Sequence, residues 1–322
     1  MELKFGLIPS PPDYRDWQYG LLYGAATVPE SYDMTGQCGP VRDQGRFGTC
    51  GGQAGSGVKD KHEGAVTSPL YIYDWAKKLD GIPDQEGTYL RTIMQVLLDK
   101  GICLESTLPY SRMSWPTMPI ITEAMDNEAA QFKIGGYARA STMQEIKQSL
   151  AADRPVLAGV LVCQSFIDAP GGNIPVPGSM GADNILGLHA ILVMGYDDNR
   201  EAAGYKGFFK FKNSWGEDWG DQGYGYVPYE FFNWRDSLGM PAWMESWTCV
   251  DVFTPPIGCK EGWLWIGSKT ANIDGKLMAL DVAPFIDPCA SRTLVPFRFI
   301  AENMGYVVKW NPTDKSIHFF KP

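Results

Sequence analysis

The chain has 322 residues, of which 44% are hydrophobic and 13% aromatic, enough apolar surface for one large core and a smaller second one. Its formal net charge of −9 and its sequence pI near 4.9 argue against nucleic acid as a partner, because such binding requires a basic patch. No apolar run reaches the roughly 18 residues that a membrane helix needs, so we expect no membrane span.

Residues 1–27 are rich in Pro, Tyr and Asp and predict an extended N-terminal segment. Its first apolar run, residues 3–8, is too short and too soon interrupted by prolines to be a secretory signal. Two interpretations of the segment remain open. We favour a strap that lies over the surface, and the alternative is a short stretch that crosses or guards a binding cleft.

A glutamine and a cysteine, Gln44 and Cys50, stand six residues apart at the start of the next region. A single cysteine is more often buried and inert than reactive, so Cys50 needs support from other residues. If Cys50 opens a helix, the positive helix end favours its thiolate. Four glycines make this helix poor by propensity, and we interpret them as positions of close packing. They are Gly51, Gly52, Gly55 and Gly57.

The pattern of apolar residues then changes from helical to strand-like along the chain. Apolar residues at helical spacing predict a helix over residues 90–98, and Ser141 with Glu145 marks the start of a second, short one. From about residue 155 apolar runs typical of buried strands follow. These runs are 156–162, 190–194, 208–211 and 224–227. Helices first and a β-sheet second predict an α+β fold.

A histidine and an asparagine fall in the strand-rich half. His189 stands in an apolar run, where a lone histidine is more often a core residue, and Asn213 alone is often a turn residue. Together with Gln44 and Cys50, however, they are the parts of a thiol acyl-transfer site. A neighbouring imidazolium lowers the pKa of a thiol, and an amide orients the imidazole. The Gln44 side chain and the Cys50 backbone N–H supply donors to an oxyanion.

These motifs resemble those of the papain-like cysteine peptidases, in particular their bacterial branch. The matching pieces are residues 28–33, 41–45 with Cys50, 108–110, 189–190, 195–196, 213–216, 219–220 and 223–224. The interval of 139 residues from Cys50 to His189 lies in the range of about 130–150 expected of the family. The family commonly has an aromatic residue after the nucleophile, whereas this chain has Gly51.

The resemblance implies a papain-like two-lobed fold over residues 28–254, with a helical lobe and a β-barrel-like lobe around the active site. The implied roles are nucleophile, base, orienting amide, oxyanion-hole donor and shielding indole. They fall on Cys50, His189, Asn213, Gln44 and Trp215, respectively.

Substrate-binding residues are carried over in the same way. Gly87 corresponds to the glycine whose backbone hydrogen-bonds an extended substrate strand. Tyr89, Leu188 and Ala190 correspond to residues that line the pocket for the second residue before the cut. Because these three side chains are largely apolar, we expect a hydrophobic or aromatic residue to be preferred there.

After a linker at residues 255–262 the chain predicts a small C-terminal ββαββ module over residues 263–322. Its parts are a hairpin with its turn at 273–276, a helix over 294–305 and a second hairpin over 307–320. The module resembles the copper amine oxidase N-terminal-like domain through residues 272–276, 281–284 and 294–302. Its only histidine is His318, so we expect no copper, and the chain as a whole predicts no metal and no cofactor.

The resemblance of the module implies a non-catalytic unit that docks to a cell-surface or protein partner, as in exported proteins of Gram-positive bacteria. We therefore expect an extracellular or cell-surface setting, with the cytoplasm as the alternative. Cys249 and Cys259 flank the linker and form a candidate disulfide.

The function predicted from these residues is that of a cysteine endopeptidase, a hydrolase that acts on polypeptide substrates. Two alternatives stay open. One is a peptide-binding protein on the same fold whose cleft is silent or blocked. The other is a thiol acyl transferase, in which an amine rather than water captures the acyl-enzyme.

Overall fold

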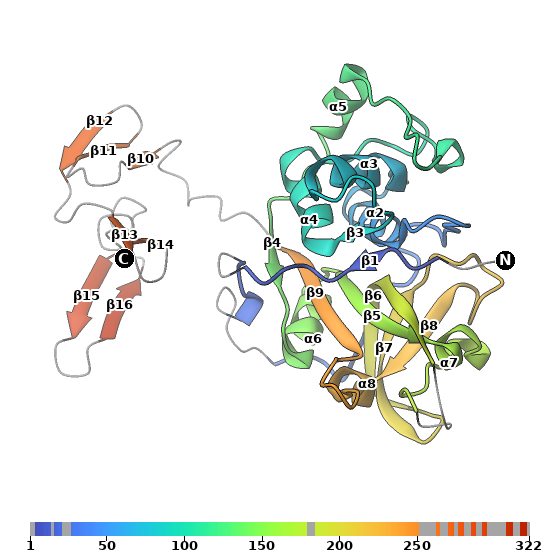
Figure 1. Cartoon of the computed structure of the whole chain (residues 1–322). Helices are drawn as coiled ribbons and strands as arrows, with labels where there is room; N and C mark the ends of the chain where they lie inside the picture. Colours follow the sequence, from blue (N-terminus) through green and yellow to red (C-terminus); the bar gives the residue numbers. More distant parts are fainter. Residues whose placement is uncertain are drawn as a thin grey trace. The chain divides into compact units, whose positions relative to one another are not determined.

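A computed structural model describes residues 4–13, 16–20, 27–178 and 184–250, together with seven short strands beyond residue 250 (Figure 1). The chain divides into two compact units, Met1–Val250 and Asp251–Pro322, and each is described by itself. Among the described residues, no helix has both the length and the apolar character needed to cross a membrane.

The helical lobe of the first unit is built on three helices that pack on one another and a shorter fourth. They are α2 (Cys50–Glu63), α3 (Pro69–Leu79), α4 (Leu90–Asp99) and α5 (Glu123–Ala129). Helix α3 begins where the Ser68 side chain accepts the Tyr71 N–H and Pro69 takes the first turn. The helix predicted over residues 90–98 is confirmed as α4, whose apolar face is buried.

The second lobe is an antiparallel sheet in the order β4–β9–β5–β6–β7–β8, with β2 paired to β6. Its strands are β2 (Ser31–Asp33), β4 (Gly136–Arg139), β5 (Val156–Cys163), β6 (Ile185–Ala202), β7 (Tyr205–Lys212), β8 (Tyr224–Pro228) and β9 (Trp243–Val250). All four strands predicted from apolar runs are confirmed. The α+β papain-like fold expected from the sequence is therefore present.

Short helices border the sheet. They are α6 (Met143–Ala151), α7 (Gln164–Ile167) and α8 (Tyr229–Asn233), with single turns of 3₁₀ helix at Tyr110–Arg112 and Pro170–Gly172. Helix α6 confirms the second predicted helix and starts with a capping box. The Thr142 side chain accepts the Glu145 N–H, and Glu145 in turn accepts the Thr142 N–H.

The two lobes meet where α2 packs against β6, and the glycines of α2 allow its close packing on β6 and on the neighbouring helices α3 and α4. A Cβ on Gly57 would lie 2.6 Å from Leu192 Cδ2 of β6. A Cβ on Gly52 would lie 2.6 Å from the Pro69 carbonyl oxygen, and one on Gly55 would lie 2.5 Å from Ile93 Cγ2. The predicted close packing is confirmed at these three positions. It outweighs the low helix propensity of glycine.

The N-terminal segment runs between the lobes. Strand β1 (Leu7–Ile8) pairs in parallel with β3 (Thr88–Tyr89), just ahead of α4. Figure 1 shows β1, in dark blue, between the helices and the sheet. This segment is therefore part of the peptidase-like unit and not a separate arm.

The C-terminal unit contains β10 (Gly262–Leu264), β11 (Thr270–Ile273) and β12 (Lys276–Ala279) in one sheet. Two further hairpins are β13 (Phe285–Asp287) with β14 (Arg292–Leu294), and β15 (Val307–Asn311) with β16 (Ser316–Phe320). The predicted turn at residues 273–276 and the final hairpin are confirmed. Most of the predicted helix over 294–305 and Cys259 lie outside the described residues.

Replacing Gly52 by alanine tests the packing of α2. The added methyl group meets a backbone carbonyl that cannot rotate away, so we expect Gly52→Ala to lower the free energy of unfolding by about 1–3 kcal/mol. Gly51→Ala is the control, because its methyl group meets nothing closer than 3.4 Å and gains helix propensity. Urea unfolding of both variants measures the difference, and a Gly52→Ala protein as stable as Gly51→Ala would contradict it.

Candidate active site

Cys50 is the first residue of α2, and its thiol is fully buried. Thr49 precedes it without a side-chain cap, so the free N–H groups of the helix end are close to the thiol. Burial raises the pKa of Cys50, and the backbone N–H groups of Ala190, Gly6 and Gly51 oppose that rise. Cys50 thus lies against Ala190 of β6, the residue after His189, and on another side against Gly6 of the N-terminal segment.

His189 of β6 and Asn213, which follows β7, are joined by a hydrogen bond of 2.8 Å between Nε2 and Oδ1. The same Oδ1 accepts the Ser214 N–H at 2.8 Å, so this atom is an acceptor and Nε2 carries the proton. The lone pair is then on Nδ1, which is buried without a hydrogen-bond partner. Asn213 therefore selects the tautomer in which Nδ1 can take up a proton.

Burial also fixes the charge of this histidine. It lowers the pKa of His189 to about 4, while the hydrogen bond to Asn213 acts in the opposite direction. At neutral pH the ring is uncharged, and the pKa of the Cys50 thiol is raised. In this conformation burial therefore disfavours both the Cys50 thiolate and the His189 imidazolium, the two charged forms that a reactive ion pair needs.

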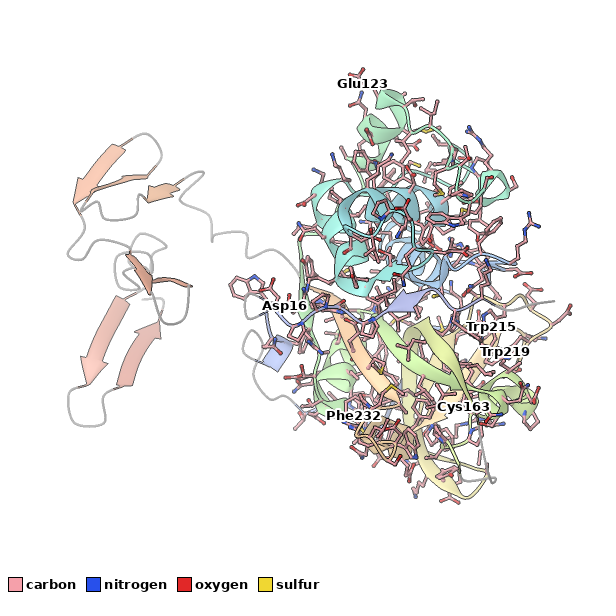
Figure 2. All side chains as sticks on the ribbon, in the orientation of Figure 1. Asp16, Glu123, Cys163, Trp215, Trp219 and Phe232 are labelled. Carbon is pink, nitrogen blue, oxygen red and sulfur yellow. The ribbon has the colours of Figure 1, made fainter. Side chains whose placement is uncertain are left out.

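Aromatic rings enclose the His189–Asn213 pair. The Trp215 ring packs on the His189 ring with centroids 4.6 Å apart, and Trp219 meets Trp215 edge-on at 5.2 Å (Figure 2). Trp215 thus lies where a shielding indole was expected. On the other side Phe5 of the N-terminal segment approaches both His189, at 6.4 Å, and Trp215, at 6.3 Å.

Gln44 already holds a carbonyl oxygen. Its Oε1 accepts the Ser214 hydroxyl at 2.7 Å, which orients the amide. Its Nε2 donates to the Phe47 carbonyl at 2.8 Å and to the Lys4 carbonyl at 3.0 Å. The predicted oxyanion donor is therefore engaged by the backbone of the N-terminal segment.

The segment is fastened on both sides of the site. The Gly6 carbonyl accepts the Thr88 N–H at 3.0 Å, and the Lys4 ammonium pairs with Glu86 at 2.8 Å. Further along, the Ser10 N–H donates to Glu245 Oε1 at 2.9 Å. The surface strap that we favoured from the sequence is thus wrong for residues 4–10. These residues cross the site, as in the alternative interpretation.

Glycine is required where the segment passes Cys50. A Cβ on Gly6 would lie 1.8 Å from the Gly48 carbonyl oxygen. A Cβ on Gly87 would lie 2.7 Å from the Gly6 carbonyl oxygen, and one on Gly187 would lie 2.8 Å from the Phe5 ring. Real Cβ atoms do not come this close to other atoms. The segment therefore fits in its place only because positions 6, 87 and 187 are glycines.

The predicted substrate-binding residues lie along the same passage, with one correction. The Gly87 N–H donates to the Tyr73 hydroxyl and its carbonyl accepts Lys77 Nζ, both at 2.9 Å, so its N–H is not available to a strand. The strand pairing expected of Gly87 is made by Thr88, one residue further on. Tyr89 is the other residue of β3, and Leu188 and Ala190 flank His189 on β6.

The sequence did not single out Tyr110 or Ser214 as site residues. The Tyr110 hydroxyl lies 2.6 Å from Thr49 Oγ1 and donates to the Gln44 carbonyl at 2.8 Å, so it ties the start of α2 to the Gln44 loop. Ser214 links Gln44 to Asn213. Its place directly after Asn213 was the only signal for it.

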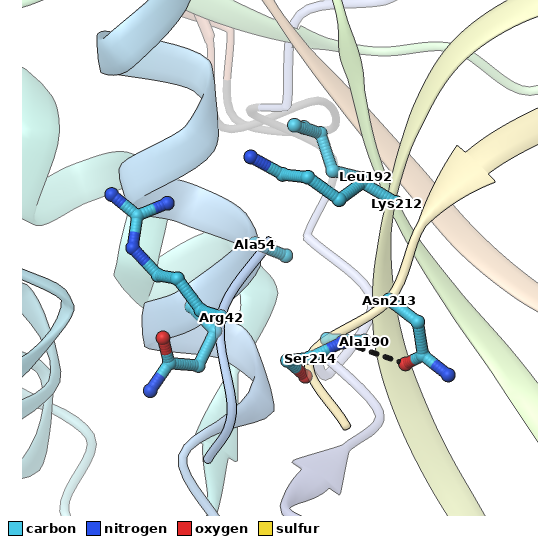
Figure 3. Close-up of a pocket in the computed structure, with 8 residues that line it drawn as sticks. Arg42, Ala54, Ala190, Leu192, Lys212, Asn213 and Ser214 are labelled. Carbon is cyan, nitrogen blue, oxygen red and sulfur yellow. Dashed lines mark hydrogen bonds between the residues drawn. The ribbon is translucent and has the colours of Figure 1, made fainter. Parts of the chain in front are cut away.

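A small cavity of about 10 Å³ lies behind Asn213, between α2 and the sheet (Figure 3). It is lined by Arg42, Gln53, Ala54, Ala190, Leu192, Lys212, Asn213 and Ser214. Among the residues that line the cavity, Asn213 Nδ2, Arg42 Nη1 and both polar atoms of the Gln53 amide are buried without hydrogen-bond partners in the described part of the chain.

The family model for papain family cysteine proteases matches residues 28–232, and the chain belongs to this family. The model for the copper amine oxidase N-terminal domain matches residues 260–321. Both resemblances expected from the sequence are therefore confirmed.

Relatives of the first unit agree with this family. Mouse cathepsin J is 28% identical over 221 residues, covering 66% of this chain and 59% of its own. Mouse cathepsin K is 27% identical over 224 residues, covering 66% and 64%. The chain thus spans less than two thirds of these relatives. Among solved structures, xylellain, a cysteine protease from Xylella fastidiosa, is 27% identical with a TM-score of 0.63, covering 78% of this chain and all of its own.

Alkylation of Cys50 tests whether the segment covers the thiol. In Gly6→Ala the methyl group cannot fit beside Gly48, so the segment must leave its place. We expect iodoacetamide to modify Cys50 at least about tenfold faster than in the parent chain, as measured by peptide mass spectrometry. Gly51→Ala adds the same methyl group beside Cys50 without a clash and should leave the rate close to that of the parent. Equal rates of Cys50 alkylation in Gly6→Ala and Gly51→Ala would contradict the conclusion that the N-terminal segment covers the thiol.

Proposed function

We propose that the chain is a cysteine endopeptidase that hydrolyses peptide bonds of polypeptide substrates. Cys50 is the nucleophile, His189 the base and Asn213 the residue that orients His189. The observation that carries this proposal is the hydrogen bond from His189 Nε2 to Asn213 Oδ1. It leaves Nδ1 as the proton acceptor in a ring on the strand that faces Cys50.

The reaction follows from these positions. Nδ1 takes the thiol proton, and the Cys50 sulfur attacks the substrate carbonyl carbon. The oxyanion is stabilised by Gln44 Nε2 and the Cys50 backbone N–H, each contributing about 3–4 kcal/mol by analogy with a measured donor. When the C–N bond breaks, the imidazolium returns the proton to the leaving amine. Water activated by His189 then attacks the thioester and releases the second product.

In this proposal the described conformation is the resting state. The Lys4 carbonyl takes the donor that the oxyanion needs, and Gly6 lies against the thiol. Exclusion of water keeps both Cys50 and His189 uncharged. Residues 4–10 therefore have to leave before a substrate can be cleaved. A cleft that never opens would instead give the blocked peptide-binding protein, which is the second candidate function.

An epoxide that alkylates activated thiols, together with a casein assay, separates these functions. We expect Gly6→Ala to be labelled at Cys50 and to degrade denatured casein. Cys50→Ala in the same background should lose both, because it removes the proposed nucleophile. Cys103→Ala, which removes a different buried thiol, should retain both.

Three other results contradict this proposal. Casein that survives although Cys50 is labelled supports the silent or blocked protein. Products that carry an added amine indicate the acyl transferase. Labelling and hydrolysis that persist in Cys50→Ala would assign the nucleophile elsewhere.

We also propose that residues 263–322 form a non-catalytic docking module, joined by a linker at 255–262 to a peptidase domain over 28–254. The family match over residues 260–321 and the separate compact unit support this division. The resemblance of the module favours an extracellular or cell-surface setting. Fractionation of cells that express the full chain tests this setting, and a protein confined to the cytoplasm would contradict it.

Removing the module tests its role in catalysis. A chain that ends after Thr254 should cleave a small fluorogenic peptide with kcat/KM within about twofold of the full chain, both carrying Gly6→Ala, because no proposed site residue lies beyond it. A loss of activity with the fold retained, as judged by circular dichroism, would assign the module a part in the reaction.

A further inference from the structure

Helix α3 holds Gly87 by both of its backbone hydrogen-bonding groups. The Gly87 N–H donates to the Tyr73 hydroxyl and the Gly87 carbonyl accepts Lys77 Nζ, both at 2.9 Å. Tyr73 and Lys77 stand four residues apart on α3, so they lie on one face of the helix. Both residues are buried. Gly87 is therefore fixed to α3 at the point where the chain enters β3.

Lys77 uses its other donors on the same loop, residues 80–87. Its Nζ pairs with Asp80 Oδ2 at 2.7 Å and donates to the Ile82 carbonyl at 2.9 Å. The Asp80 side chain has no exposed surface, and its Oδ1 accepts the Ile82 N–H at 3.0 Å. An ammonium group has three N–H donors, so all three donors of Lys77 are engaged. One side chain of α3 thus joins Asp80, Ile82 and Gly87.

The way in which Gly87 is held decides what the next residue presents to the cleft. Gly87 has a φ of +98°, a conformation that glycine adopts readily. With the Gly87 N–H turned to Tyr73, the Thr88 N–H donates to the Gly6 carbonyl at 3.0 Å. Once residues 4–10 leave, the Thr88 N–H is free to meet a carbonyl of a bound polypeptide. The register of this pairing therefore depends on the hydrogen bonds that α3 makes to Gly87.

Separate contacts hold the start of α2, where Cys50 lies. The Tyr110 hydroxyl lies 2.6 Å from Oγ1 of Thr49, directly before Cys50. The loop reaches this region through Glu86, which accepts the backbone N–H two residues before Cys50 at 2.8 Å. Among the described residues, Glu86 forms no hydrogen bond with Lys77. Loss of the Lys77 hydrogen bonds therefore affects the substrate-facing strand more than the surroundings of Cys50.

We propose that Lys77 is a positioning residue, which holds residues 80–87 so that the Thr88 N–H meets the backbone of a polypeptide in the cleft. The inference rests on the proposed function and adds to it a residue of α3 that acts through the loop. Its effect is confined to ligands that are long enough to pair with Thr88. Reagents that contact only Cys50 do not depend on it.

Peptide binding to an inactive full-length chain tests the positioning apart from catalysis. The protein carries Gly6→Ala to displace the segment and Cys50→Ala to prevent turnover, and anisotropy measures its binding of a fluorescent extended peptide. Lys77→Met combined with Asp80→Asn removes the three donors without leaving a buried carboxylate unpaired. We expect this double variant to bind at least about tenfold more weakly, because the loop no longer presents an aligned donor. Tyr73→Phe releases only the Gly87 N–H and should weaken binding about threefold.

Lys78→Met combined with Asp74→Asn is the matched control. These residues form the neighbouring ion pair of the same helix, with Nζ and Oδ2 2.6 Å apart, and they receive the same substitutions. The control should bind the peptide within about twofold of the parent. Equal affinities of the two double variants overturn the proposal. If circular dichroism shows that the Lys77 variant does not fold, Tyr73→Phe decides, and an affinity equal to that of the parent overturns the proposal.

The same variants in a chain that retains Cys50 separate positioning from a general loss of structure. We expect the Lys77 double variant to raise KM for an extended peptide at least about tenfold, while kcat and the rate of Cys50 alkylation by iodoacetamide stay within about threefold. A parallel fall in kcat and in alkylation assigns Lys77 a structural role and overturns the proposal. Binding that depends on Lys77 without hydrolysis by the Cys50 protein would retain this proposal and reject the peptidase.

Discussion

The close approach of Gly6 to Gly48, with Cys50 beside them, is the constraint on which the rest of the site depends. Backbone meets backbone at a spacing that leaves no room for even one methyl group. This contact places the Lys4 carbonyl on Gln44, the Phe5 ring against His189 and Trp215, and the Leu7 side chain on Gly159. Lys4, Phe5, Gly6 and Leu7 thereby contact, in turn, the proposed oxyanion donor Gln44, the proposed base His189, the proposed nucleophile Cys50 and Gly159 of β5.

Residues 4–10 affect the charge of Cys50 and His189 in addition to blocking access to them. A thiolate–imidazolium pair is stable only where dipoles or water solvate it, and this site offers backbone N–H groups to the thiol but an apolar enclosure to the ring. Because burial lowers the pKa of His189, the covered state binds fewer protons than an open one. The conformation in which residues 4–10 cover the site is therefore most stable at pH values above 6.5, the ordinary pKa of histidine. It becomes less stable as the pH falls toward about 4, the pKa of the buried ring. The anchors Lys4–Glu86 and Arg91–Asp16 add hydrogen-bonded ion pairs at the margins of the same segment.

The sequence predicted the parts of the site that depend on residue type and local pattern. Gln44, Cys50, His189 and Asn213 stand in motifs whose spacing is specific, and the buried strands follow from continuous apolar runs. The path of residues 4–10 had no such signal. It depends on glycines at 48, 87 and 187, which are distant in sequence and meet only in the fold. The same holds for Thr88, which differs from Gly87 by one residue of register.

The protonation of His189 in the full-length chain tests this account most directly. The chain has only three histidines, so the ring signals in an NMR titration can be assigned by comparison with His189→Gln. We predict a neutral ring with its proton on Nε2 at neutral pH and a pKa of about 4 in the parent chain, and a pKa that rises toward the ordinary value of 6.5 once Gly6→Ala has displaced the segment. A His189 ring that is already protonated at neutral pH in the parent chain, or that titrates at its ordinary value of 6.5, would contradict the account.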